Sequence, residues 1–343
     1  MMTGNGKSPR VSVIIPAYNA AAHLTDAVSS VLNQSFKDLE VVVVDDGSTD
    51  ETPAIIDSFG DRIRHVRRKN GGVAEALNTG IALARGKYVG LLAADDLVRP
   101  GATEIQVRLL EQHPGAALLH GGAYEIDETG ATLGVRQRRG PTTVIESSRE
   151  AVKRLLRGND IVCSSVMMRR SALSEVSGFN QECMPGEDWE MWLKLAARYD
   201  LIYTSAILAS YRIHSQSLTA GVDLSSYAAS HQRTLQLMFE EGGIGNHTDL
   251  AGYARAAHLR TMASIAAHYR RHARSFPYLA RALGKQPSLI REAKTWATLF
   301  TVIKSSLPRF AIRLGRSLRS RLRSSPRERP EGEDAVPQRN LAR

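Results

Sequence analysis

Four short polar clusters contain the side chains best suited to chemistry. They occupy residues 16–19, 45–50, 95–96 and 186–190. Each of the first three directly follows a short apolar run of the kind that forms a buried strand. Ligands of parallel α/β sheets bind outside the carboxyl ends of the strands, so we expect these three clusters to meet in one site.

The first two clusters could bind a nucleotide. Residues 16–19 (PAYN) have no glycine-rich turn, so they lack the fingerprint of dinucleotide-binding folds. Tyr18 could stack on a nucleobase or simply pack against the protein. Asp45 and Asp46 repel each other unless they are hydrogen-bonded or paired, and one of them could accept from a base N–H. The polar residues 48–50 need no ligand, because they can cap the helix that follows.

The third cluster, Asp95 and Asp96, suits a divalent cation. Mg²⁺ and Mn²⁺ take oxygen ligands, commonly one or two carboxylates together with phosphate oxygens and water. The other reading is a solvated turn before Arg99. The sequence therefore leaves open a metal site and an ordinary turn at this position.

The fourth cluster, GEDWE at 186–190, is predicted to begin a helix. Acids in a first turn complement the helix dipole, and that accounts for any one of them. Three acids in four positions exceed what capping requires, and a partly desolvated carboxylate can act as a general base toward a hydroxyl. Of Trp189 and Trp192, one is expected to pack against a sugar face and the other to lie in the core.

Alternating strands and helices position these clusters. We predict strands at 11–15, 41–44, 63–66 and 88–92, and helices at 20–32, 52–59 and 73–84. Repeated βα units predict an α/β fold with a doubly wound, mainly parallel sheet. The pattern after residue 102 is mixed, with helices at 103–112 and 148–157 and strands at 117–120 and 165–169, and residues 224–301 read as mostly helical.

The positive charge of the chain is concentrated near its end. The 343 residues carry a net charge of +10, and residues 304–329 contain nine basic residues and one acid, Glu328. Apolar residues recur there every three or four positions, from Leu299 to Leu322, which predicts a basic amphipathic helix followed by a disordered segment. Such a helix could contact an anionic membrane surface or pack on the protein with a solvated cationic face.

Composition limits the cellular setting. Two cysteines, Cys163 and Cys183, form neither a disulfide framework nor a structural zinc site. The polar start of the sequence shows no apolar signal segment, and no apolar run is long enough for a membrane-spanning helix. We therefore expect a cytoplasmic protein in a reducing compartment, peripheral at the inner face of the membrane if the tail binds lipid.

The ordered set of motifs resembles family 2 glycosyltransferases of the GT-A fold. The resemblance covers about residues 9–220, and no single motif carries it alone. The matching segments are VSVIIPAYNA (11–20), VVVVDDGSTDET (41–52), NGGVAEALNTGIALARGKYV (70–89), LLAADDLVRP (91–100), MMRRSAL (167–173), GFN (178–180), GEDWEMWLKLA (186–196) and YRIHSQSLT (211–219). It divides the chain into a disordered start (1–9), a GT-A catalytic domain (10–220), a helical region (221–295) and the basic tail (296–343).

The resemblance also implies roles for single residues. Asp188 is expected to be the catalytic base. Asp95, as part of the family's DXD motif, and His214, in a segment near the phosphates, are expected to bind Mg²⁺ or Mn²⁺. The alternative for His214 is a structural or surface histidine. The donor or acceptor sugar is expected beside Asp96, Glu187 and Trp189. The nucleotide pocket is expected to contain Pro16, Tyr18, Asn19, Asp45, Asp46, Asn70, Gly71 and Asp95.

Two departures from the family pattern bear on activity. Ala93 stands where many relatives have the first Asp of the motif, and Leu77 stands where many have an arginine that helps hold the nucleotide. Arg68 or Lys69 could supply the missing cation. The departures motivate an alternative function, a sugar-nucleotide-binding regulatory protein without catalysis.

The predicted function is inverting transfer of a sugar from a nucleotide sugar, UDP-linked by expectation, to an acceptor hydroxyl. The acceptor would be a glycan or lipid-linked molecule of cell-envelope or extracellular polysaccharide or glycolipid synthesis. A third reading, a nucleic-acid-binding protein that uses only the arginine-rich tail, is disfavoured by the near-neutral charge of the preceding sequence. No nucleic-acid partner is therefore expected.

Overall fold

The computed structural model describes residues 8–138, 142–215, 217, 224–268 and 272–306. Its strands are β1 Val11–Ala17, β2 Leu39–Asp45, β3 Arg64–Arg67, β4 Tyr88–Leu91, β5 Leu97–Val98, β6 Ala116–Ile126, β7 Thr132–Arg136, β8 Thr143–Glu146, β9 Met167–Arg169 and β10 Asp200–Arg212. Its helices are α1 Leu24–Leu32, α2 Thr52–Ser58, α3 Val73–Leu83, α4 Ala102–Gln112, α5 Ser148–Leu156, α6 Arg170–Ser174, α7 Glu187–Ala196, α8 Leu224–Phe239, α9 Ala251–His268, α10 His272–Lys285 and α11 Ala293–Ser306.

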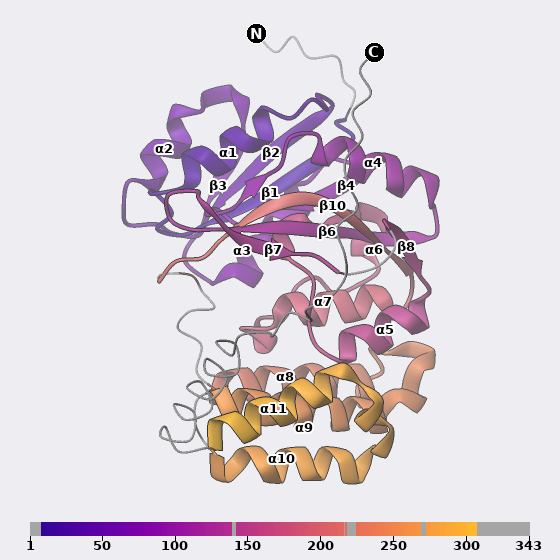
Figure 1. Ribbon diagram of the computed structural model, residues 1–343. Helices are drawn as coiled ribbons and strands as arrows, with labels where there is room; N and C mark the ends of the chain where they lie inside the picture. Colours follow the sequence, from indigo (N-terminus) through magenta and orange to yellow (C-terminus); the bar gives the residue numbers. More distant parts are fainter. Residues whose placement is uncertain (1–7, 139–141, 216, 218–223, 269–271, 307–343) are drawn as a thin grey trace, which may run out of the picture.

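The first half of the sheet is parallel, in the spatial order β3-β2-β1-β4 (Figure 1). Strands β1, β2 and β4 are the predicted apolar runs, and Ile14 of the central β1 pairs with Val42 on one side and Leu91 on the other. The helices between these strands bring all the carboxyl ends to one edge. The polar turns after β1, β2 and β4 therefore lie along that edge, which confirms the predicted α/β class.

The second half of the sheet is mixed. Strand β9 is antiparallel to both of its neighbours, β4 and β6, while β10 runs parallel to β6 and antiparallel to β5 and β8. The predicted strand at 117–120 is the first part of the much longer β6, and β7, β8 and β10 were not predicted. Strand β10 combines two buried stretches with an irregular register between Thr204 and Ala209, so neither alternation nor a continuous apolar run marks it.

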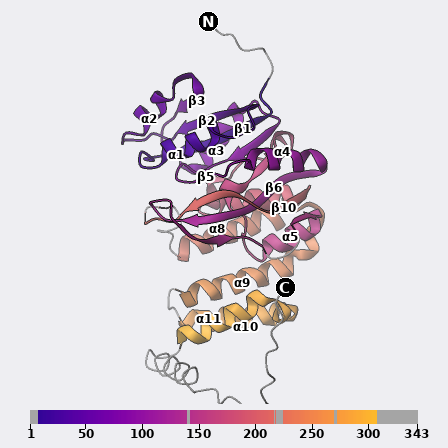
Figure 2. The ribbon, with the colours of Figure 1, turned by 45° about the horizontal axis from the view of Figure 1, so that its top comes forward.

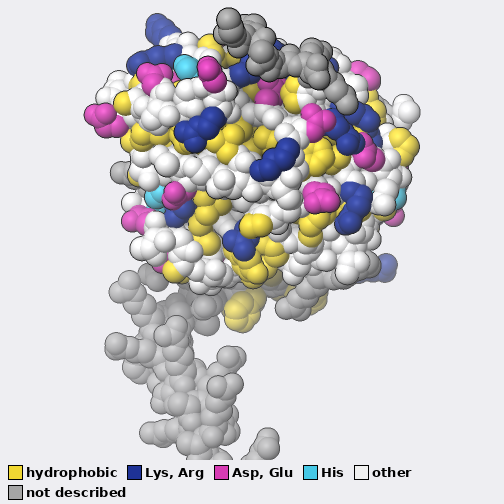
Figure 3. All heavy atoms as spheres, turned by 90° about the horizontal axis from the view of Figure 1, so that it is seen from above, with side chains coloured by type: hydrophobic (Ala, Val, Ile, Leu, Met, Phe, Trp, Pro, Cys, Tyr) yellow, Lys and Arg dark blue, Asp and Glu magenta, His cyan; other side chains and the backbone are white. Residues whose placement is uncertain are grey.

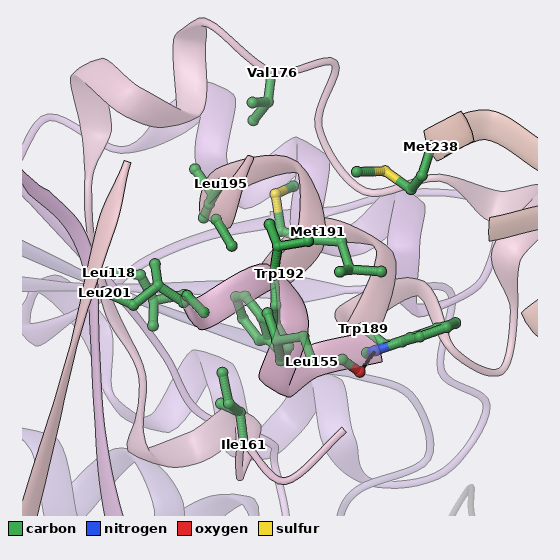
Figure 4. Packing of buried hydrophobic residues seen from close by; sticks show 14 of the residues in the cluster. Leu118, Leu155, Ile161, Val176, Trp189, Met191, Trp192, Leu195, Leu201 and Met238 are labelled. Atoms are coloured by element: carbon green, nitrogen blue, oxygen red, sulfur yellow. Dashed lines mark hydrogen bonds between the residues drawn. The ribbon is translucent and has the colours of Figure 1, made fainter. Parts of the chain in front are cut away.

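Helices cover both faces of the sheet and form two cores. Strand β1 contributes to both, since Ile14 points into one core and Ile15 into the other. Helices α1 and α4 pack on the Ile15 side, while α3, α5 and α7 pack on the Ile14 side. Trp192 of α7 is fully buried beside Leu118 and Leu155, in the core on the Ile14 side of the sheet (Figure 4). Helix α7 is therefore fixed rigidly along its length.

Helices α8–α11 form a further layer beyond α5 and α7, with α9 packed against α8, α10 and α11 (Figures 1 and 2). The helical prediction for 224–301 is confirmed, and the tail prediction from residue 307 onward lies outside the described residues. Within the described part of the chain, no helix combines the length and the apolar character needed to span a bilayer. On the face opposite these helices, acidic and basic side chains are interspersed (Figure 3).

Candidate active site

Asn19 ties the turn after β1 to the turn after β2. Its backbone is left-handed (φ 49°), a conformation that asparagine tolerates better than most residues. Its N–H donates to Ser48 Oγ (3.0 Å) and its side-chain oxygen accepts from the Thr49 N–H (2.8 Å). Tyr18 beside it is 52% exposed and Pro16 is half-buried in β1. Tyr18 is thus accessible to a nucleobase, whereas Asn19 shapes the turn.

Asp46 binds the loop that follows β3. Its buried carboxylate accepts from Arg68 Nη1 (2.6 Å) and from the N–H groups of Gly71 (3.1 Å) and Gly72 (2.7 Å). Arg68 also pairs with Glu75 (3.2 Å). Arg68, one of the two cations that could replace the missing family arginine, is therefore already engaged by two carboxylates. Asp46 organises the loop, and a role in reading a base stays a prediction.

The adjacent Asp45 closes the turn after β2. One of its oxygens accepts from the Ser48 N–H (2.9 Å), and the other lies 3.3 Å from Arg67 Nε. Gly47 follows with φ 80°, and a Cβ there would lie 2.9 Å from the backbone nitrogen of Asn70. The turn after β2 and the loop after β3 are thus in direct contact, as the predicted nucleotide pocket requires.

Asp96 lies inside the protein and not beside a sugar, so that part of the prediction is wrong. It is 2% exposed, accepts from Ser164 Oγ, and accepts from the Arg212 N–H at 2.8 Å. Burial, and then the neighbouring Asp95 carboxylate, raise its pKa to about 7. Asp96 therefore fixes the turn that presents Asp95.

Asp95 and His214 form the exposed part of this turn. Asp95 Oδ2 lies 2.8 Å from His214 Nε2, and the side chain of Asp95 is 30% exposed. The buried Arg212 holds the turn of Asp95 in place by donating to the backbone oxygens of Asp95 (2.8 Å), Asp127 (2.9 Å) and Glu128 (2.9 Å). The predicted proximity of residues 95 and 214, which lie far apart in sequence, is thus present.

This pair is chemically suited to a divalent cation. Among the described residues, no three His, Cys, Asp or Glu side chains gather as a complete metal site. Mg²⁺ and Mn²⁺ in phosphate-binding sites need only one or two protein ligands, because the substrate phosphates and water supply the others. A carboxylate with an imidazole beside it at a strand end meets that requirement.

Asp188 lies in the first turn of α7, at the other acidic cluster. One carboxylate oxygen accepts from Asn159 Nδ2 (2.8 Å) and the other from the Trp189 N–H (2.6 Å). Burial raises the pKa of Asp188, and these two donors oppose the shift. Burial and the Asp188 charge raise the pKa of Glu187 to about 7. The two acids thus hold protons more tightly than solvated carboxylates, as a general base near neutral pH requires.

Trp189 contradicts the prediction of a sugar-stacking tryptophan. It is 2% exposed, its indole N–H donates to the Leu155 oxygen at 2.8 Å (Figure 4), and its ring stacks on His231 of α8 at 4.0 Å. Trp192 is fully buried as well, so neither ring faces a ligand. Trp189 packs the start of α7 against α5 and α8.

One loop, residues 159–165 between α5 and β9, joins the two acidic clusters. Its Asn159 donates to Asp188, while its Ser164 donates to Asp96. Between them, burial and then the carboxylates of Asp188, Glu187 and Asp96 raise the pKa of Cys163 well above its usual value. Both acidic clusters therefore lie next to the 159–165 loop.

Sequence reasoning missed three residues that build the site. Asn159 and Ser164 lie in a loop without a motif, and their partners are 29 and 68 positions away in sequence. Arg212 stands within the segment YRIH that contributed to the family resemblance, and its nearness to His214 is the signal that could have identified it.

The fold is that of GT-A glycosyltransferases. S. aureus TarS 1–349 in complex with UDP-GlcNAc aligns with a TM-score of 0.57 at 15% identity, covering 82% of this chain and 92% of that one. The mannosyltransferase PcManGT from Pyrobaculum calidifontis, in complex with GDP-Man and Mn²⁺, aligns with a TM-score of 0.51 at 19% identity, covering 88% and 87%.

The chain belongs to glycosyl transferase family 2, whose family model matches residues 12–177. An uncharacterized glycosyltransferase of Rickettsia prowazekii is 32% identical over 222 residues, which are 64% of this chain and 68% of that protein. Chondroitin synthase of Escherichia coli is 32% identical over 192 residues, 55% of this chain and 26% of that protein. The chain spans only 30–35% of the length of three other rickettsial relatives.

Proposed function

We propose that the protein is an inverting glycosyltransferase that transfers a sugar from a UDP-sugar to an acceptor hydroxyl. The observation that carries the proposal is that two acidic clusters are bound to the same 159–165 loop, one with the partly exposed Asp95 and one with Asp188. A leaving nucleotide and an attacking hydroxyl need separate groups of this kind on opposite sides of the anomeric carbon.

At the nucleotide end, Tyr18 and the turns after β1 and β2 would contact the base. Asp95 and His214 would hold Mg²⁺ or Mn²⁺, which when bound neutralises charge on the diphosphate. Arg212 keeps Asp95 in position through the backbone of the turn. At the other end, Asp188 would take the acceptor proton while the hydroxyl oxygen bonds to the anomeric carbon and the bond to the diphosphate oxygen breaks.

Support for a UDP-linked donor comes from the TarS complex with UDP-GlcNAc, and support for polysaccharide or glycolipid synthesis comes from the chondroitin synthase relative. The PcManGT complex with GDP-Man shows that the fold also accepts a guanosine donor. Which nucleotide the donor carries is therefore tested by measuring nucleotide binding.

Calorimetry should show UDP binding to the protein with Mn²⁺ or Mg²⁺ and much weaker binding with EDTA. Asp95→Ala should weaken binding in Mn²⁺ at least about tenfold, because the cation loses its carboxylate ligand. Asp57→Ala, which removes an exposed acid on α2, is the matched control and should bind as wild type. UDP binding that is equal with and without metal would contradict the role of Asp95. If the protein binds GDP or dTDP but not UDP, the donor is a sugar linked to that nucleotide.

The departures at Ala93 and Leu77 support the alternative of a non-catalytic sugar-nucleotide-binding protein. Leu77 lies on α3 with its side chain buried in the core. Its position therefore offers no place for a nucleotide-binding cation. The alternative predicts UDP binding without release of UDP from any UDP-sugar, whereas the enzyme releases UDP in the presence of an acceptor.

We also propose that the C-terminal helices bring the enzyme to an anionic membrane surface, where a lipid-linked acceptor would lie. Trp296, Phe300 and Ile303 follow one another at spacings of four and three on α11, and they are 56%, 65% and 46% exposed. The sequence that follows carries the basic residues of 304–329. Each Lys or Arg near an anionic surface contributes about 1 kcal/mol, which falls with salt.

The double variant Trp296→Ser, Phe300→Ser should bind anionic vesicles at least about tenfold more weakly in co-sedimentation. Each large apolar side chain contributes about 1.5–3 kcal/mol when it leaves water. Leu133→Ser removes an equally exposed residue from β7, on another part of the molecule, and should not change binding. If the double variant binds as wild type, α11 does not insert. If binding also survives deletion of residues 297–343, the tail is not the anchor.

A further inference from the structure

The carboxylate of Asp188, the proposed base, accepts a second hydrogen bond, from Asn159, to which the proposed reaction assigns no role. Asn159 Nδ2 donates to Asp188 Oδ2 (2.8 Å), while the Asn159 side-chain oxygen accepts from the Ile161 N–H (3.2 Å). An amide whose oxygen is occupied in its own loop must present its NH₂ group outward. The loop therefore fixes which end of Asn159 faces Asp188.

The loop is held from behind by the C-terminal helices. The carbonyl of Arg157, two residues before Asn159, accepts from Arg260 Nη2 on α9 (3.2 Å) and from Lys294 Nζ on α11 (3.3 Å). The side chain of Arg157 donates to Tyr253 on α9 (2.9 Å). A loop of the catalytic fold is thus fastened at one point to two helices beyond it.

The fastening itself is well buried. Arg260 is 2% exposed, and its other nitrogen pairs with Glu292, which also accepts from the Tyr253 hydroxyl (2.5 Å). A guanidinium buried in this way is costly unless its donors are satisfied, and here Arg157 is one of the acceptors. The position of the Arg157 carbonyl is therefore set by the packing of α9 and the segment before α11.

We propose that Asn159 is the positioning residue of the Asp188 base, and that helices α9 and α11 set its position through Arg157. This inference rests on the proposed function of Asp188. It makes the C-terminal helical layer a part of the catalytic machinery and gives it a task that is separate from membrane contact.

The physical effect of Asn159 is twofold. It holds one carboxylate oxygen of Asp188, while the Trp189 N–H holds the other. The two hydrogen bonds together restrict rotation of the carboxylate. It also stabilises the ionised form, since an amide N–H donates to a carboxylate more strongly than to a carboxylic acid. The other titratable groups around Asp188 are Glu187 on its own helix, Cys163 on the loop and Tyr227 on α8.

The test follows the ionisation of Asp188 directly. In protein labelled with ¹³C at the aspartate carboxyl carbons, the resonance missing from Asp188→Asn belongs to Asp188. Its titration midpoint should move up by about one to two pH units in Asn159→Ala, which is the loss of one hydrogen bond to a charged group. Asn78→Ala is the matched control, because Asn78 also binds a loop through both ends of its amide, at Phe179 and away from the base.

Activity gives the second measurement, as UDP release from UDP-GlcNAc across pH. A base must be ionised, so the rate falls below its pKa, and a raised pKa moves this acidic limb to higher pH. Asn159→Ala should therefore show an acidic limb at higher pH and a lower kcat with an unchanged KM for the donor. Asn159→Gln, which keeps the amide donor, should recover part of the wild-type kcat.

The link to the C-terminal helices is tested with Lys294→Met and Arg260→Met. Each removes one donor from the Arg157 carbonyl, and each should move the Asp188 midpoint in the same direction as Asn159→Ala but less far. Lys294 lies at the surface, so its variant remains informative if Arg260→Met does not fold.

An unchanged Asp188 midpoint in Asn159→Ala would overturn the positioning role, even if Asp188→Asn is inactive and the proposed function stands. An Asp188 midpoint that moves in Asn159→Ala but not in Lys294→Met or a folded Arg260→Met would overturn the part played by α9 and α11. Full activity of Asp188→Asn would overturn the proposed base itself, whatever the midpoint does.

Discussion

Asp188→Asn should lower turnover by about 10²–10⁴-fold, the usual contribution of a general base. Asparagine has the same shape and can still accept from the Trp189 N–H, so α7 should begin unchanged. The affinity for UDP should stay within about two-fold, because the nucleotide contacts that we propose involve other residues, at the turns after β1, β2 and β4. Initial rates with a saturating donor, together with UDP calorimetry, measure both quantities.

Glu182→Gln provides the comparison for this variant. Glu182 is an exposed acid shortly before α7 and pairs with Arg233, so neutralising it removes one negative charge without removing the base. Its turnover should remain close to wild type. A turnover of Asp188→Asn within a few-fold of wild type, with an acceptor that the wild type uses, would assign the base to another residue, and Glu187 is the next acid on the helix.

Arg212→Met should lower the free energy of unfolding by about 3 kcal/mol. Three backbone oxygens, those of Asp95, Asp127 and Glu128, lose their charged donor, and each such loss costs about 1 kcal/mol. UDP binding in Mn²⁺ should weaken as well, because the turn that presents Asp95 loses its support. Urea titration and calorimetry on the same preparation measure the two effects.

Arg136→Met is the matched variant, because Arg136 lies on β7 and pairs with Glu125 at the surface, with half of its side chain exposed. Exposed ion pairs contribute about 0–1 kcal/mol, so its stability should change little. If Arg212→Met unfolds at the same urea concentration as Arg136→Met, the three carbonyls find other donors and Arg212 does not hold the turn.

The first half of the fold could be predicted because three of its four strands, β1, β2 and β4, are continuous apolar runs between short helices. Strand β10 could not, since its two buried stretches flank an irregular segment and give neither alternation nor a single run. The site divides in the same way. The turns with Asp45 and Asp95 follow from strand ends, whereas the contact of Asp188 with Asn159 depends on how two helices and a loop pack.

Trp189 shows where reasoning from residue type fails. An aromatic side chain next to acids is compatible with a sugar platform or with a core position, and the sequence does not say which face of α7 is covered. In the structure α8 crosses that face and His231 stacks on the ring, while burial, and then the nearby His258, lower the pKa of His231 to about 3. A neutral imidazole is therefore packed there as an ordinary aromatic ring.

The contacts of Arg212 give the turn between β6 and β7 an unexpected status. Residues 127–131 lie at the surface and look like a place where a tag or an extra domain could be inserted without harm. Two of their carbonyls, however, are held by the same guanidinium that holds Asp95. For protein engineering, this hairpin belongs to the framework of the proposed donor site, and its length is constrained although its side chains are exposed.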